Sequence, residues 1–161
     1  MFASVNAFIP ASFKVERYVE LELSEKQLYN YVRDLNHFKS WNPWFNLENA
    51  VTELQGQIGE KGSVLMITEG NLDSRMELAY LKPTNDVRFA LDLPSHQSVE
   101  SLYFLIERQE NGAAKIVAGL KGKRSFPFRI LNLMMNKGVG PQLEMILNKI
   151  NIDLLRAAGE E

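Results

Sequence analysis

The sequence of 161 residues contains no cysteine. Disulfide bonds, thiol catalysis and thiolate metal sites are therefore excluded. Charge of one sign is also scarce, because 18 Lys and Arg residues are balanced by 20 Asp and Glu residues, which leaves a net charge of −2. A chain without a basic excess is not expected to bind nucleic acid.

Long apolar runs are missing as well. No stretch reaches the ~20 consecutive apolar residues of a membrane-spanning helix, so no integral membrane span is expected. Residues 1–11 have no basic start, and Asn6 and Pro10 interrupt their apolar character. We therefore expect no signal peptide, and a cytoplasmic protein is the default expectation.

What the chain does have is the composition of an ordinary globular protein, 45% hydrophobic and 24% charged. Its length suits one domain, and no repeat, low-complexity tract or linker divides it. We predict a single domain over residues 1–161, in which residues 1–12 form a flexible N-terminal arm.

The first part of the domain combines a strand with two short helices. Apolar residues alternate with charged ones over residues 13–23, which predicts a half-buried strand on whose apolar side Arg17 is the one charge. Ser24 and Gln27 have the spacing of a capping box at a helix start. A second short helix is expected over residues 36–40, before Pro43.

The middle of the chain is typical of an antiparallel sheet. In the segment 74–81, Met76, Leu78 and Tyr80 alternate with polar residues and should share the buried face. Asn111-Gly112 predicts a type I′ hairpin turn. Short turns between the segments exclude parallel crossovers. The expected strands cover residues 51–54, 63–68, 74–81, 86–93, 99–108 and 114–123.

The C-terminal part predicts one long amphipathic helix, since apolar residues recur at three- and four-residue spacing from Val139 to Leu154. Its apolar stripe needs a partner, and the concave face of the sheet is the large apolar surface left. The predicted fold is α+β, with a curved antiparallel sheet of about six or seven strands wrapped around this helix, two short helices after the first strand, and an apolar pocket inside.

Several local patterns resemble the START-like (SRPBCC) superfamily, and in particular its polyketide cyclase/dehydratase and lipid-transport group. The most specific is Asp34 followed by Trp41-Asn42-Pro43-Trp44, and Gly140-Pro141 resembles the start of the family's long helix. Ala118 stands where the family often has tryptophan. The resemblance implies a helix-grip fold with a hydrophobic cavity, in a family that includes lipid and sterol carriers, polyketide cyclases and a co-chaperone.

The resemblance and the alternation together predict binding of an apolar or amphipathic small molecule, a lipid or an aromatic metabolite, for carriage or sensing. Trp41 and Met134 each have a second interpretation, Trp41 as a structural corner with Trp44 and Met134 as a core filler. The predicted ligand-binding residues are Trp41, Met76, Leu78, Phe89, Leu91, Phe104, Ala118, Met134, Leu143 and Leu147.

Chemistry beyond binding has little support in the sequence. His37 with Asp34, and His96 in a loop, are read as surface residues, so no catalytic residue, metal ligand or cofactor is predicted. A cyclase or dehydratase is the first alternative, with Tyr80, Tyr103 or Arg17 as its acid or base. The second alternative is a protein-interaction module of the co-chaperone type, which would have a filled core and an exposed apolar patch. The ligand's identity and the oligomeric state stay open.

Overall fold

The computed structural model describes residues 9–44, 49–92, 98–124 and 128–159. Along the chain its elements alternate as the sequence predicts, with one strand, short helices, a run of strands and a long helix. They are β1 (Ser12–Leu21), α2 (Glu25–Arg33), η1 (Leu35–His37), α3 (Phe38–Trp41), β2 (Val51–Gln55), β3 (Val64–Glu69), β4 (Leu72–Lys82), β5 (Asp86–Asp92), β6 (Ser98–Arg108), β7 (Ala114–Arg124), η2 (Phe128–Met134) and α4 (Met135–Gly159).

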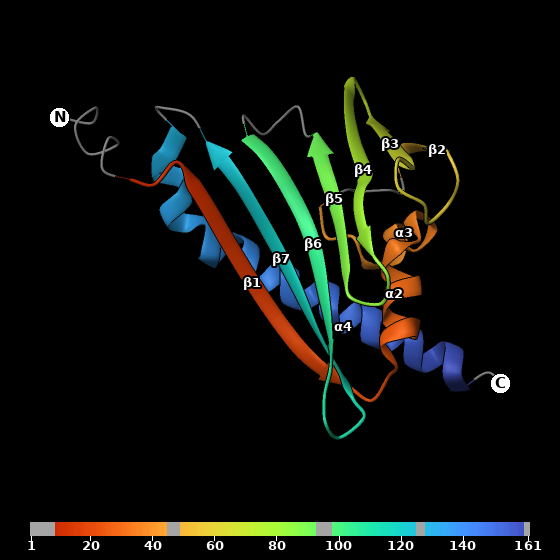
Figure 1. Ribbon diagram of the computed structural model, residues 1–161. Coiled ribbons are helices and arrows are strands. Elements are labelled where there is room, and N and C mark those ends of the chain that lie inside the picture. The colour runs from red at the N-terminus through yellow and green to blue at the C-terminus, as the bar shows by residue number, and fades with distance from the viewer. Residues whose placement is uncertain (1–8, 45–48, 93–97, 125–127, 160–161) are drawn as a thin grey trace.

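The strands form one 7-stranded antiparallel sheet in the order β1-β7-β6-β5-β4-β3-β2. Only the β1–β7 pairing joins strands that are far apart in sequence, because every other neighbour follows along the chain. The sheet curves, and α4 lies across the side away from the viewer in Figure 1, with α2 and α3 beside its C-terminal half. The predicted helix-grip fold is confirmed.

The core lies between α4 and the concave face of the sheet. Val139, Leu143, Ile146, Leu147 and Ile150 of α4 are all buried, as their spacing predicts. On β1 the alternation places Phe13, Val15 and Leu21 in the same cluster. Burial of this one continuous apolar surface therefore ties the last element of the chain to the first.

The entry into the first helix follows the sequence closely. The Gln27 amide donates to the Ser24 hydroxyl at 3.2 Å, and the Ser24 amide donates to the Gln27 side chain at 3.0 Å. This reciprocal pair is the predicted capping box, and it satisfies backbone donors that a helix start leaves free.

The strand alternation fails at one place, in β4. The register between β4 and β5 shifts between Leu78 and Tyr80, so that Leu78 pairs with Phe89 and Tyr80 pairs with Arg88. An extra residue in one strand reverses the faces of all that follows. Tyr80, expected beside Leu78 on the buried face, is therefore on the outer face and exposed.

The hairpin between β6 and β7 also differs from the prediction. Type I′ needs positive φ at two successive residues, but Gly112 has φ +86° while Asn111 is not in that region. The Gly112 amide donates to the Gln109 carbonyl, and the Gln109 amide to the Ala113 carbonyl. This is the longer loop that ends in a left-handed glycine, and the Asn111 side chain supports it by accepting from the Ala113 amide at 3.0 Å.

The predicted N-terminal arm falls mostly on residues 1–8, which lie outside the described residues. Across the described part of the chain, no helix has both the length and the apolar character that crossing a bilayer requires.

A pair of glycines in α4 offers a test of how the helix meets β1. A Cβ at Gly140 would collide with the Arg17 guanidinium, whereas a Cβ at Gly138 would meet nothing within 4 Å. Gly138→Ala should raise the free energy of unfolding by up to about 1 kcal/mol, because alanine is the better helix former. Gly140→Ala should be less stable than Gly138→Ala by about 1 kcal/mol or more, since Arg17 loses its hydrogen bonds.

Urea denaturation of both variants measures the difference. Equal stability of the two variants would show that the Arg17 contact with α4 contributes nothing.

Candidate functional site

An aromatic cluster fills the interior where α3 meets the sheet. Trp41 packs edge-on against Phe38, with ring centroids 4.9 Å apart, and against Phe104 of β6, at 5.6 Å. Phe104 in turn contacts Phe89 of β5 edge-on at 6.4 Å. The indole N–H of Trp41 is buried, and it has no hydrogen-bond partner among the described residues. Ring contacts therefore hold this side chain, which favours the structural-corner interpretation.

The ten residues predicted to bind ligand come from seven elements, and the fold brings nine of the ten into the core. Those of the sheet share its concave face, where Met76 pairs with Leu91, Leu78 with Phe89, and Phe104 with Ala118. Ligand contact by any of them stays a prediction. The nine buried residues are Trp41, Met76, Leu78, Phe89, Leu91, Phe104, Ala118, Leu143 and Leu147.

Solvent is fully excluded at the centre of this interior and has slight access at one end, which we call the looser end. Leu78, Phe104 and Leu143 are completely inaccessible to solvent, whereas Leu91 and Val139 retain some exposure. Leu91 belongs to the last part of β5 and Val139 to the first part of α4. Met134, the tenth predicted residue, precedes α4 on η2 and is 66% exposed.

At the looser end, two charged residues lie on the concave face. Glu100 pairs with Gly122, and it shares the face of Leu102 and Phe104. Its carboxylate accepts from the Arg124 guanidinium at 3.4 Å, and the two side chains are only 3% and 11% exposed. Ions with so little access to water are costly unless they are paired.

The surroundings of Arg124 are partly apolar and partly polar. Its guanidinium lies 4.9 Å from the centre of the Phe13 ring. It also donates to the Met135 sulfur at 2.9 Å and to Asn132 Oδ1 at 3.4 Å. Arg124 thus links the end of β7 with β1, η2 and the start of α4.

Sequence reasoning missed this pair. Glu100 has the phase of Leu102, Phe104 and Ile106, which would place it inward. The other phase of the same strand is apolar too, with Tyr103 and Leu105, so alternation alone did not select a face.

Polar contacts attach α4 to the rest of the fold at several places along the helix. Arg17 on the edge strand β1 donates to Glu144 Oε1 at 2.7 Å and to Asn136 Oδ1 at 3.0 Å. Arg17 therefore pairs with a protein carboxylate at the edge of the sheet. The Trp44 indole donates to Gln142 at 2.7 Å.

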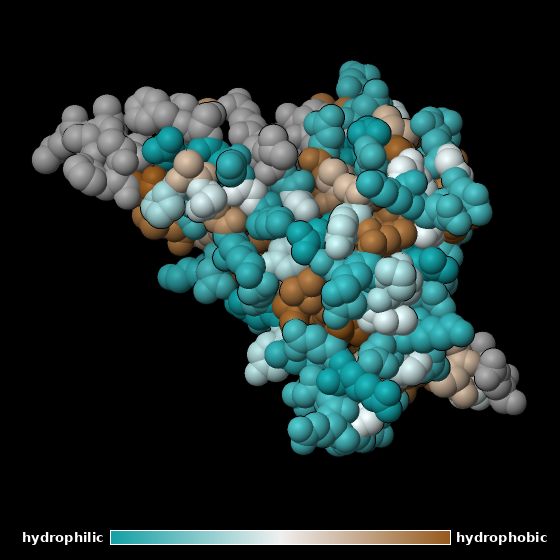
Figure 2. Space-filling model, in the orientation of Figure 1, coloured by the Kyte–Doolittle hydropathy of each residue, from teal (hydrophilic) through white to brown (hydrophobic). Residues whose placement is uncertain are grey.

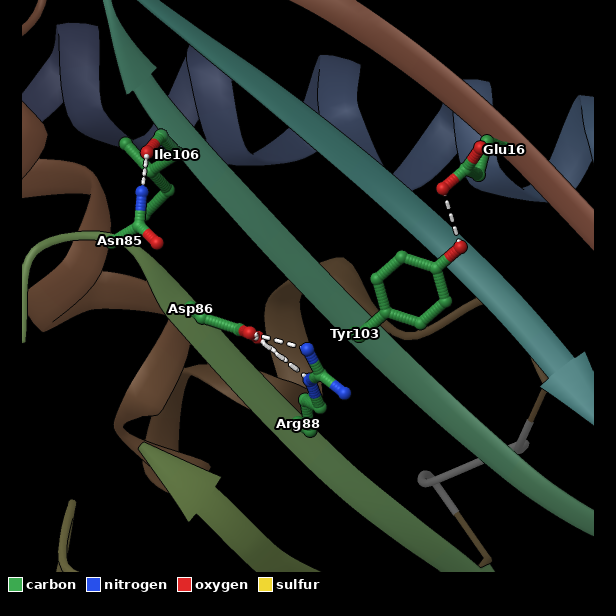
Figure 3. A network of polar contacts seen from close by, with 6 residues as sticks. All are labelled: Glu16, Asn85, Asp86, Arg88, Tyr103 and Ile106. Carbon is green, nitrogen blue, oxygen red and sulfur yellow. Dashed lines mark hydrogen bonds and ion pairs between the residues drawn. The ribbon is translucent and has the colours of Figure 1, made fainter. Parts of the chain in front are cut away.

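The outer face of the sheet carries a separate polar network (Figure 3). The Tyr103 hydroxyl donates to Glu16 across β7 at 2.5 Å, and Arg88 binds Asp86 at 2.6 Å. Tyr80 lies over Arg88 on the same face. Both tyrosines proposed as acids or bases are therefore on the wrong side of the sheet to face the interior, and much of this side is hydrophilic in Figure 2.

Histidine chemistry also finds no support among the described residues. His37 stacks on Tyr31 with ring centroids 4.3 Å apart, and its Nε2 is 3.9 Å from Asp34. The described part of the chain contains no group of three or more side chains able to hold a metal ion. His96 lies outside the described residues.

This architecture defines a class. A seven-stranded curved sheet gripped by one long C-terminal helix, with two short helices after the first strand, is the fold of the START-like (SRPBCC) superfamily. No family model matches the sequence, and no curated protein does. The narrower assignment to the polyketide cyclase/dehydratase and lipid-transport group therefore stays a prediction.

Solved structures supply the particular likenesses. The chain is similar to norcoclaurine synthase from Thalictrum flavum, with a TM-score of 0.69 and 11% identity over 91% of this chain and 96% of that one. It is equally similar to SA2116 of Staphylococcus aureus, a protein of unknown function (0.69, 12%, covering 97% and 100%). A major latex-like protein from Panax ginseng follows at 0.61 and 12%, covering 89% and 98%. These neighbours belong to the START-like superfamily, and at such identities they establish the fold alone.

Two phenols of the structure provide a test of the polar contacts. Burial, together with a hydrogen bond to a carboxylate, raises the pKa of Tyr31 (beside Asp153) and of Tyr103 (beside Glu16) well above the ordinary 10.0. The folded state thus favours the neutral phenols, and their contribution to stability should fall as the pH rises above 10.0.

Tyr31→Phe and Tyr103→Phe should each remove one late-ionising phenol from an alkaline titration of phenolate absorbance, followed while circular dichroism still reports the fold. A titration in which neither substitution alters the late phase would contradict the two contacts.

Proposed function

We propose that the protein binds an amphipathic small molecule between α4 and the concave face of the sheet, for carriage or sensing. The observation that carries this proposal is the buried Glu100–Arg124 pair on an otherwise apolar face. Ligand sites combine a mainly apolar wall with a few placed polar groups. An apolar interior with one ion pair at its looser end has that composition.

The Glu100–Arg124 pair would determine how a bound ligand is oriented. Arg124 offers several N–H donors in a planar fork, which suits a carboxylate or hydroxyl group of a ligand. The apolar body would then point from Arg124 into the interior, where burial contributes about 25 cal/mol per Å² before entropic costs. We propose the ten residues predicted from the sequence as the apolar wall for that body, with Met134 at its entrance.

A neighbouring structure supports the choice of ligand class. Norcoclaurine synthase from Thalictrum flavum, 12% identical to this chain, has been solved in complex with dopamine and hydroxybenzaldehyde. Both molecules carry polar groups on an aromatic body. Because the fold is shared and Arg124 offers a polar contact, we propose the same class of ligand for this chain, molecules with an aromatic or aliphatic body and a polar end.

The enzymatic alternative has weaker support. Of its three candidate groups, Tyr80 and Tyr103 are on the outer face and Arg17 is held by Glu144. Glu100 is a buried carboxylate that could exchange a proton with a ligand. Its contact with Arg124 favours a positioning role for the pair over proton transfer.

Native mass spectrometry of freshly purified protein, with solvent extraction of any bound molecule, tests the proposal directly. We expect a stoichiometric adduct with an apolar body and a polar end. A bare protein mass, with no thermal stabilisation by a panel of fatty acids, sterols and phenols, would overturn the proposal.

The role of the pair is tested by removing both charges together, because removal of one would leave a buried unpaired ion. In Glu100→Gln/Arg124→Gln, the dissociation constant for a fatty acid should rise about tenfold, the loss expected for one charge-assisted hydrogen bond. The methyl ester of the same acid should bind both proteins equally, since its body is unchanged. Isothermal titration with the two ligands measures this difference.

The matched control is Asp86→Asn/Arg88→Gln, which removes an ion pair from the outer face of the sheet. It should leave the affinity for both ligands unchanged. An equal loss in both double variants, or an equal loss for acid and ester, would contradict a headgroup role for Arg124.

A further inference from the structure

The segment η2 exposes apolar side chains in an unusual density. A short helix on a globular surface ordinarily buries one face, but none of the side chains of η2 is buried. Leu133 and Met134 are each 66% exposed. The apolar patch of η2 consists of Phe128, Ile130, Leu131, Leu133 and Met134.

The patch lies in a part of the chain that is positively charged. Residues 111–143 contain no Asp or Glu, although the whole chain has a net charge of −2. Two exposed lysines flank η2 along the chain, and neither pairs with a carboxylate among the described residues. They are Lys123, at the end of β7, and Lys137, in the first turn of α4.

A basic hollow lies at the same end of the sheet, but on its outer face, and no residue of η2 lines it. Lys14, Lys121 and Lys123 line it together with Ser12 and Ser101, around a volume of about 750 Å³. The Asn132 side chain of η2 donates a hydrogen bond to the Pro10 carbonyl at 2.8 Å, which attaches η2 to the chain just before β1. In Figure 1, η2 is the light-blue segment beside the start of β1, and Figure 2 has brown and pale atoms at that corner.

The acidic groups of this region are already neutralised. Glu16 pairs with Lys14 at 2.8 Å, Glu144 with Arg17 at 2.7 Å, and Glu100, which also lines the hollow, with Arg124. The surface that η2 presents is therefore apolar at its centre and cationic at its edges. A second copy of the chain would oppose these cations with identical ones, which disfavours self-association through the patch.

We propose that η2 and its basic surroundings dock onto the surface of an anionic lipid bilayer. The aliphatic side chains enter the boundary between headgroups and acyl chains, and the lysines lie against lipid phosphates. Docking at η2 places the looser end of the interior next to the bilayer, but docking itself does not require that the interior hold a ligand.

Vesicle flotation tests the proposal, with phosphatidylcholine alone and with phosphatidylcholine mixed with phosphatidylserine. The wild-type chain should float with the mixed vesicles only, and less so at high salt, because surface charges are screened. Leu133→Glu/Met134→Glu should lower partitioning at least about tenfold, as should Lys123→Gln/Lys137→Gln, since each lysine near an anionic surface contributes about 1 kcal/mol.

Leu155→Glu is the matched control. Leu155 is 55% exposed and lies near the other end of α4, so its charge should leave flotation unchanged. All five substituted residues are exposed, and unchanged circular dichroism should confirm that each variant folds.

Three results would overturn the proposal. The first is absence of flotation with either vesicle. The second is a Leu133→Glu/Met134→Glu protein that floats like the wild type. The third is an oligomer or protein complex of the wild type, detected by light scattering, that is lost in Leu133→Glu/Met134→Glu while vesicles bind neither protein. The patch would then be a protein interface.

Discussion

The structure depends on one constraint, that a single amphipathic helix must cover the whole concave face of a seven-stranded sheet. Burial of the α4 stripe provides the driving force, but apolar contact has no direction and would allow the helix to slide. Polar contacts on both sides of the helix provide the position. Arg17 binds Glu144 and Asn136 on the side of β1, and Trp44 binds Gln142 on the other.

Gly140 belongs to the same arrangement. Without a side chain there, the Arg17 guanidinium can lie directly against the helix. The edge strand β1 is thereby fixed to α4 and, through ten paired positions, to β7. An edge strand that would otherwise offer free backbone groups to other chains has its position determined by the helix beneath it.

Both the interior and the surface of the protein change in character from one end of the sheet to the other. At the centre, aromatic rings pack edge-on and leave the core closely filled. Toward the end with Glu100 and Arg124 solvent has slight access, an ion pair takes the place of rings, and η2 exposes apolar side chains. A binding site and a docking surface at one end of the molecule would let a stable core coexist with an adaptable end.

The sequence by itself determined the class of fold, because period-two strands, the Ser24–Gln27 box and the α4 stripe are local patterns with one physical meaning each. It also determined which residues are in the core, from Trp41 to Leu147. The prediction for Tyr80 was wrong because the alternation of residue types does not reveal a β-bulge. The type of turn at Asn111-Gly112 depends on the loop length, which is set by the pairing register of β6 and β7. Only the tertiary structure decided that Glu100 and Arg124 meet on the concave face and that the apolar side chains of η2 are exposed, because both depend on how distant segments meet, which sequence spacing does not encode.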